Sequence, residues 1–177
     1  MTRRKERPDT HFPYLPENPD ITRGGEQFHA YPAKSFLGEQ GVFAYYVIML
    51  LGHEELSAFL ALLQSRFSTT ELLNESIVDN EYQESLALSY REEFGGYLVE
   101  ATTNSISLLR SFDTLFTAPP APWVVFPGMD PIEANLPKQG SLEYWWENIW
   151  VPFWTSRSES ERELFLQTAP DDWREVL

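Results

Sequence analysis

Carboxylates are the residues best suited to chemistry in this sequence, and they are concentrated in one part of it. Between residues 39 and 100 there are eleven acids and two bases, Arg66 and Arg91, which gives a local net charge of −9. Clustered carboxylates can attract a basic protein over long distances, or perform acid–base catalysis when one of them stays protonated. The function of this chain therefore depends on what surrounds these acids.

The densest group of acids lies between residues 71 and 84. Glu71, Glu75 and Asp79 are four residues apart, which predicts that they share one face of a helix. Like charges at this spacing cost a helix about 0.2–0.5 kcal/mol per pair, so helix stability does not explain them. Together with Glu81 and Glu84 they form the predicted partner-binding patch. The alternative is a solvated face that keeps an acidic protein soluble.

A second candidate contact lies in residues 143–154, which contain four of the six tryptophans. On a helix, Trp146 belongs to the face that packs into the core, whereas Glu143 and Glu147 form another face. Trp145 is angularly separated from the core-facing group. Glu143, Trp145 and Glu147 are therefore a predicted contact, either for a sugar or for a protein surface rich in Lys and Arg. The alternative is that the aromatic residues only fill the core.

Motifs typical of enzymes are missing from this sequence. It has no cysteine, no glycine-rich phosphate loop with its lysine, and no G-x-S-x-G turn. His53 begins an acidic stretch, but position 57 is not a histidine, so the zinc-protease helix motif fails. A glycosidase needs one protonated and one ionised carboxylate, and only Glu143 and Glu147 lie beside the tryptophans. We predict no catalytic residue, metal site or cofactor, and keep an enzyme or carbohydrate-binding function of segment 143–154 as an alternative.

The composition argues against several classes of partner. With 13 Lys or Arg and 27 Asp or Glu residues, the 177-residue chain has a formal net charge of −14 and a pI near 4.5. This charge disfavours direct binding to nucleic acid or to an anionic membrane. No stretch approaches the roughly 20 apolar residues that span a bilayer. The basic residues Arg3 to Arg7 are followed by Pro8 rather than by an apolar run, so we expect a cytoplasmic protein.

Prolines divide the chain into regions. Eleven of the 13 prolines lie in two stretches, and proline disrupts both helices and central strands. Residues 1–34 are therefore expected to form an irregular arm. Residues 118–140 are expected to form a long connection with a short extended piece at 123–126, which is an edge strand if it pairs with another strand at all. Residues 35–177 as a whole are predicted to be a single domain.

Helical periodicity dominates the rest of the sequence. Apolar residues recur every three or four positions in several segments, which predicts helices. These helices cover residues 54–67, 69–77, 82–94, 108–116, 142–150, 158–166 and the turn after Pro170. Segment 42–51 is apolar on every side and predicts either a buried helix or a buried strand, and 97–103 predicts a strand. The predicted fold class is mainly α, a single compact helical domain with a minor β element, and the alternative is α+β.

By size and composition, the chain resembles the cytosolic inhibitors that neutralise basic enzymes, a class that includes the bacterial immunity proteins that block toxins. Long-range attraction gives such proteins fast association, and buried aromatics with a few charge pairs limit dissociation. We therefore expect a non-enzymatic acidic binding protein that neutralises a basic protein partner. The alternative among binding proteins is a DNA mimic, which presents carboxylates where a DNA-binding protein expects phosphates.

Overall fold

The computed structural model describes residues 11–177 and shows an α+β fold, with 38% of the chain in helices and 21% in strands. The prediction of a mainly α domain is therefore wrong, and the α+β alternative fits. In chain order the elements are β1 (Ala33–Phe36), η2 (Gly38–Gln40), β2 (Tyr45–Leu51), α1 (His53–Arg66), β3 (Glu75–Asp79), β4 (Ser85–Glu93), β5 (Gly96–Thr103), α2 (Ile106–Leu115), α3 (Pro122–Val125), η3 (Pro131–Asn135), α4 (Gly140–Trp145), η4 (Trp146–Trp150), α5 (Val151–Thr155), α6 (Glu159–Leu166) and α7 (Asp171–Arg174).

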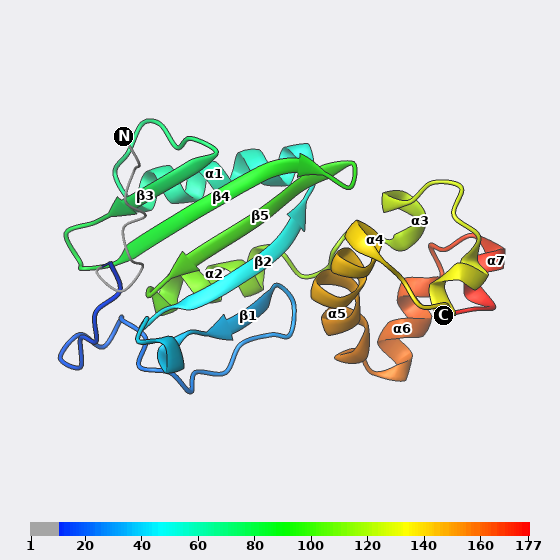
Figure 1. Ribbon diagram of the computed structural model, residues 1–177, viewed down its shortest axis with the longest axis horizontal. Helices are drawn as coiled ribbons and strands as arrows, with labels where there is room; N and C mark the ends of the chain where they lie inside the picture. The colour runs from blue at the N-terminus through cyan, green and yellow to red at the C-terminus, as the bar shows by residue number, and fades with distance from the viewer. Residues whose placement is uncertain (1–10) are drawn as a thin grey trace.

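The five strands form one antiparallel sheet in the order β1-β2-β5-β4-β3. Helices α1 and α2 cover one face of this sheet, and lie behind the strands in Figure 1. The later helices, α3 to α7, gather at one end of the sheet (Figure 1), and we call them the helical part. Strands β1 and β3 are the two edges of the sheet.

Two of the predicted helices are strands. Leu86 and Tyr90 are four residues apart, which suits a helix, but Leu88 lies between them and makes the pattern equally suitable for a strand. In β4 the buried Leu86 and Leu88 alternate with the less buried Ala87 and Ser89. The segment predicted as a helix at 69–77 is instead a loop followed by the edge strand β3.

The helices predicted at 54–67 and 108–116 are present as α1 and α2. Phe59 of α1 and Phe112 of α2 lie with their ring centroids 5.4 Å apart, and both are buried in the main core. Full burial of a side chain of this size contributes about 1.5–3 kcal/mol, which fixes both helices on the same face of the sheet. The ambiguous segment 42–51 contributes strand β2, and the strand predicted at 97–103 is confirmed as β5.

The tryptophan-rich segment is helical from Gly140 to Thr155, through α4, η4 and α5. The middle piece, η4, is a π turn in which the N–H of Val151 donates to the carbonyl of Trp146. A regular helix would place Pro152 against the carbonyl of the preceding turn and would lose one hydrogen bond. The wider π turn relieves this conflict, so the helix continues through the proline.

The other elements of the helical part begin with the caps that their sequences favour. The prediction of an extended piece at 123–126 is wrong, because residues 122–125 form the helical turn α3. Pro122 is its first residue, where the missing N–H costs no hydrogen bond. Helix α6 begins with a capping box between Ser158 and Glu161, as its spacing predicts.

No helix in the described part of the chain is long and apolar enough to cross a membrane.

The segment before β1 runs along the body of the protein without regular helix or strand over residues 11–32, and the first ten residues of the predicted arm lie outside the described residues. Ile21 pairs with Ser105 in an isolated bridge. Lys34 in β1 donates to Asp113 of α2 at 2.5 Å, and this ion pair is almost fully buried. The bridge joins the segment to the residue that caps α2, and the ion pair joins β1 to α2.

Candidate functional site

A hollow of about 560 Å³ lies on the sheet face opposite α1 and α2. At the end of this face nearest the helical part, η4 contacts β2, and Ile48, Leu50 and Leu98 are buried. The hollow occupies the part of the face that remains open, and we call it the sheet hollow. Its lining residues are Tyr46, Glu75, Ser76, Ile77, Ala87, Leu88, Ser89, Glu100 and Thr102.

The strand register brings these residues together although they are far apart in the sequence. Opposite residues in antiparallel strands point to the same face. Thr102 of β5 lies opposite Tyr46 of β2 on one side and opposite Ala87 of β4 on the other. Ile77 of β3 in turn lies opposite Ala87. One row of side chains therefore crosses the open face over four strands.

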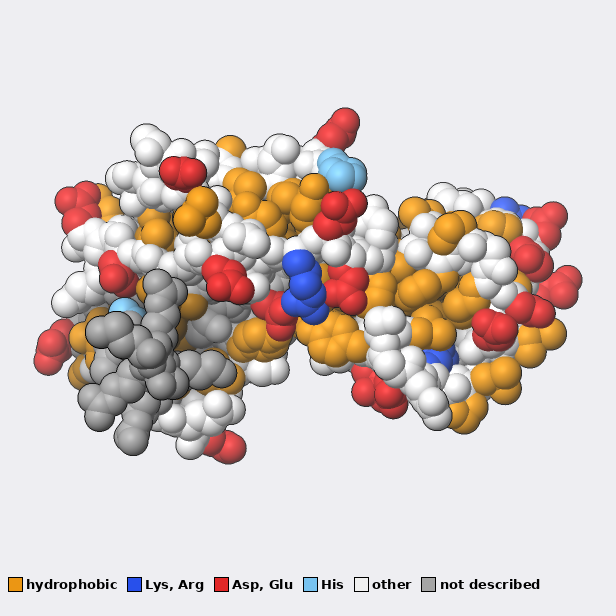
Figure 2. All heavy atoms as spheres, turned by 45° about the horizontal axis from the view of Figure 1, so that its top comes forward, with side chains coloured by type: hydrophobic (Ala, Val, Ile, Leu, Met, Phe, Trp, Pro, Cys, Tyr) orange, Lys and Arg blue, Asp and Glu red, His pale blue; other side chains and the backbone are white. Residues whose placement is uncertain are grey.

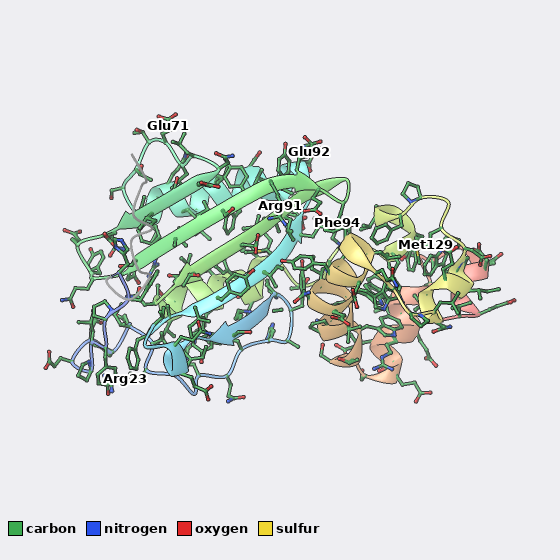
Figure 3. The ribbon with its side chains drawn as sticks, in the orientation of Figure 1. Arg23, Glu71, Arg91, Glu92, Phe94 and Met129 are labelled. Carbon is green, nitrogen blue, oxygen red and sulfur yellow. The ribbon has the colours of Figure 1, made fainter. Side chains whose placement is uncertain are left out.

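Tyr46 and Glu100, which we call the floor of the sheet hollow, belong to a cross-strand hydrogen-bonded group. The Tyr46 hydroxyl donates to Glu100 Oε1 at 2.5 Å, and Arg91 Nη1 donates to Glu100 Oε2 at 2.6 Å. Arg91 also donates through Nε to Glu93 at 2.8 Å. Arg91 and Phe94 lie near the end of β4 that is closest to the helical part (Figure 3). The floor is therefore one acid and one phenol, and the adjoining Arg91 and Glu93 add one base and a second acid.

The hydrogen bonds of the floor keep Glu100 ionised. Burial alone raises the pKa of Glu100, but the hydrogen bonds from Tyr46 and Arg91 outweigh burial, so this pKa lies below its ordinary value. Burial and the bond to Glu100 both raise the pKa of Tyr46, which therefore keeps its proton. Burial also raises the pKa of the neighbouring Tyr144 in α4. Glu100 is thus a carboxylate anion held between the neutral phenol of Tyr46 and the Arg91 guanidinium.

Glu100 is an ionised hydrogen-bond acceptor, and one of its oxygens is already bound to Arg91. A general acid needs a carboxyl group whose pKa is raised so that it is protonated near neutral pH. The pKa of Glu100 is displaced in the opposite direction. Ala87 and Thr102 beside it offer small, partly apolar side chains. A Lys or Arg side chain entering the hollow would lay its alkyl stem on this surface and direct its charged group to the carboxylate.

The edge strand β3 forms one rim of the sheet hollow. Glu75, Ile77 and Asp79 alternate along it and are all exposed, with 56% of Ile77 accessible to solvent. We call these three residues the β3 rim. Within residues 11–177, no Lys or Arg forms a salt bridge with Glu75 or Asp79. Among the residues that the structure describes, the rim therefore presents two acids without a salt-bridge partner, on either side of an apolar residue.

The space-filling view shows the surroundings of this face. In Figure 2 the sheet and the helical part meet near the middle of the view, where one small patch of basic side-chain atoms lies between acidic ones. Hydrophobic side chains are exposed on both sides of this junction (Figure 2). Mixed acidic and apolar surface is the composition that a basic protein partner would contact.

The structure separates the members of the predicted 71–84 patch. Glu71 lies in the loop before β3, at the end of the sheet away from the helical part (Figure 3), and Glu81 lies in the turn between β3 and β4. Glu75 and Asp79 are together in β3, on one strand face rather than one helix face. They point to the same side because residues four apart on a strand also share a face.

The prediction of Glu84 as a contact residue is wrong, because its side chain is buried. Its side chain is 2% exposed and accepts a hydrogen bond of 2.9 Å from Arg66 Nε and a second from Arg66 Nη2. Ser105 and Asn80 donate to it as well, at 2.6 Å each. Burial raises the pKa of Glu84, but the bonds from Arg66, Ser105 and Asn80 outweigh burial and lower it. Glu84 therefore joins α1, the β3–β4 turn and the start of α2.

The prediction of Trp145 as a contact residue is also wrong, because its side chain is fully buried. Its ring lies edge-on to Phe126 and stacks with Trp150 at a centroid distance of 5.9 Å. The wider π turn that follows changes the direction of side chains relative to a regular helix, so Trp145 and Trp146 both face inward. Trp145 therefore belongs to the core and cannot contact a partner directly.

Glu143 and Glu147 are exposed and line a smaller hollow of about 330 Å³ with Trp146 and Lys138. The Lys138 ammonium lies 4.2 Å from the centre of the Trp146 ring. A sugar would need this ring face for stacking, but the chain's own lysine covers it. This arrangement gives the carbohydrate-binding alternative no support.

Metal ligation and histidine chemistry also receive no support from the geometry. Within the described residues, no three His, Asp or Glu side chains gather closely enough to hold a metal ion. His53 is exposed at the start of α1, with its ring edge-on to Tyr97 at 5.1 Å. The contact is a packing of the two rings, edge to face.

Sequence reasoning missed Tyr46 and Glu100, which form the floor, and Arg91, which is hydrogen-bonded to Glu100. Tyr46 is one of two adjacent tyrosines in the apolar run 42–51, and no local pattern indicates which of their hydroxyl groups faces the open side of the sheet. Glu100 interrupts the next apolar strand. Their proximity follows from the β2–β5 pairing, which no local pattern specifies.

Comparison with known proteins gives no relative for this chain: no protein-family model, no curated protein and no solved structure matches it.

Proposed function

We propose that this protein is a non-enzymatic binding module that sequesters a basic protein, in the way that bacterial immunity proteins neutralise toxins. The observation that carries this proposal is the sheet hollow, where Glu100, paired with Arg91, lies beside the β3 rim, whose Glu75 and Asp79 have no salt-bridge partner among residues 11–177. The net charge of −14 adds long-range attraction for a basic partner. The protein then acts by covering a cationic surface of its partner.

The arrangement accounts for both affinity and speed. Charges on the rim, in contact with water, mainly raise the association rate, and their effect is screened by salt. Ile77 and the small side chains of the sheet hollow offer apolar area that excludes water once the partner is bound. Arg91 neutralises part of the floor, so a partner meets a surface with a defined charge pattern rather than a uniform negative field.

Affinity capture tests this function. The tagged protein is incubated at low salt with a lysate of the cells that produce it, bound proteins are eluted with a salt step, and they are identified by mass spectrometry. We expect one stoichiometric basic protein, and capture by E75K/D79K reduced at least about tenfold. The matched control is E159K/E163K, which makes the same change on α6 in the helical part (Figure 1).

Each other outcome of the capture has a defined meaning. Capture of several unrelated DNA-binding proteins would support the DNA-mimic alternative instead. Equal capture by both charge-reversed variants would exclude the β3 rim as the contact. Recovery of the protein alone, from cells in which candidate basic partners are expressed, would contradict the proposed function.

A further inference from the structure

The backbone of the edge strand β3 has hydrogen-bonding groups directed away from the sheet. The N–H of Tyr90 donates to the carbonyl of Asn74, and the N–H of Asn80 donates to the carbonyl of Glu84, each at 3.0 Å. Antiparallel strands bond through alternate residues, so the even-numbered residues of β3 bond to β4. The N–H and C=O groups of the odd-numbered residues, which are the β3 rim, therefore point outward.

No other strand uses these outward groups within the described residues, because β3 pairs with β4 alone. The strand carries no proline, and the outer edge shows no lysine. Exposed edges of this kind accept an additional strand from another chain. The rim thus combines free backbone groups with side chains that face the sheet hollow.

A second copy of this chain is a poor occupant of the edge. Two copies of β3 related by a two-fold axis at Ile77 would place Glu75 of each copy opposite Asp79 of the other, on the same face. Like charges directly opposite each other destabilise a strand pair. The same pattern favours a strand with cations at those two positions and an apolar residue between them.

We propose that the basic partner binds by adding an antiparallel strand to β3, with Lys or Arg opposite Glu75 and Asp79 and an apolar residue opposite Ile77. This inference rests on the proposed function and specifies how the partner is recognised. Backbone hydrogen bonds to the β3 rim hold the added strand, and the alternate side chains give specificity. Those side chains lie on the face of the sheet hollow, next to the floor formed by Tyr46 and Glu100.

A short peptide tests this mode of binding directly. The probe is the acetylated and amidated heptapeptide Thr-Lys-Thr-Val-Thr-Lys-Thr, which places its two lysines and its valine opposite the rim. The matched control carries N-methyl groups on those three residues, which removes their N–H donors and keeps every charge. Binding and amide hydrogen exchange are followed by NMR at low salt.

We expect the unmodified peptide to slow amide exchange at Glu75, Ile77 and Asp79, and the N-methylated peptide to bind at least about tenfold more weakly. Equal binding of the two peptides, or binding without protection of these amides, would overturn strand addition. Failure of the unmodified peptide to bind at millimolar concentration would overturn it as well.

The variant I77P separates this inference from the proposed function. Proline is tolerated on an edge strand where its nitrogen faces solvent, and a proton–nitrogen spectrum confirms that the fold is retained. I77P keeps all the charges but loses one outward N–H, so we expect it to capture at least about tenfold less partner than I77V. Equal capture by I77P would overturn strand addition alone, whereas absence of any captured partner with the natural chain would contradict the proposed function.

Discussion

The Tyr46 hydroxyl on β2 donates a hydrogen bond of 2.5 Å to the Glu100 carboxylate on β5, across the open face of the sheet. Both side chains are half-buried, and both line the sheet hollow. The bond keeps the carboxylate ionised and fixes its orientation. It explains why Glu100 acts as a hydrogen-bond acceptor and is unsuited to general acid catalysis.

Removing the Tyr46 hydroxyl tests this relationship. Y46F deletes one hydrogen bond to a half-buried carboxylate, so we expect a loss of about 1 kcal/mol in the free energy of unfolding. We also expect the pKa of Glu100 to rise, because a bond that stabilises its ionised form is lost. Urea unfolding and a carboxyl NMR titration measure the two effects. The control is Y82F, since Tyr82 is 63% exposed, and an equal loss in both variants would refute the assigned role.

The buried ion pair between Arg66 and Glu84 predicts a larger loss of stability. R66A leaves the Glu84 carboxylate buried without its cation, and we expect a loss of about 3–5 kcal/mol. R110A, an exposed arginine on α2, serves as control and should change stability by less than about 0.5 kcal/mol. Denaturant unfolding measures both. A loss below about 1 kcal/mol for R66A would mean that Glu84 is solvated rather than buried.

The same carboxylate predicts the acid side of the stability profile. The pKa of Glu84 is lower in the folded protein than its ordinary value of 4.5, and the pKa of Glu100 is lowered as well. A carboxyl group of this kind stabilises the fold above its unfolded pKa, and this contribution is lost as the pH falls through the folded pKa. We expect the free energy of unfolding to decrease steadily below about pH 4.5. In E84Q the decrease should be less steep, and an unchanged slope would argue against the lowered pKa.

The interior position of Trp145 predicts a stability effect rather than a binding effect. W145A removes a fully buried ring, and we expect a loss of about 3–5 kcal/mol in the free energy of unfolding. E143Q/E147Q changes only exposed carboxylates on the same helical segment and should leave stability nearly unchanged. Thermal unfolding compares the two variants. Little loss in W145A would place this ring at the surface and reopen the contact first predicted for it.

Helical periodicity predicted α1 and α2 because each buries a single apolar stripe against one sheet face, and such a stripe is visible in any local window. The same method failed for β4. Leu86 and Tyr90 fit both periods, and the decision between them depends on pairing with β5, which is a long-range interaction. Edge strand β3 has little burial to mark it, so its sequence carries a weak signal.

The candidate site was partly accessible from the sequence. Glu75 and Asp79 were identified by their clustering, and they share a face whether the segment is a helix or a strand. Glu84 belonged to the same cluster in the sequence, but its burial depends on Arg66 in another element. Trp145 was placed by the geometry of a regular helix, and the π turn at Trp146 invalidated that geometry. A contact between distant elements thus determined the outcome for Glu84, whereas a local departure from regular helix geometry determined it for Trp145.

The central claim is that the β3 rim recruits a basic partner, and the salt dependence of association tests it most directly. Association rates of the captured partner are measured by surface plasmon resonance from low to high salt for the natural chain, E75K/D79K and E159K/E163K. We expect E75K/D79K to associate at least about tenfold more slowly at low salt with a flatter salt dependence, while E159K/E163K changes little. Identical rates and slopes for the natural chain and E75K/D79K would contradict the claim.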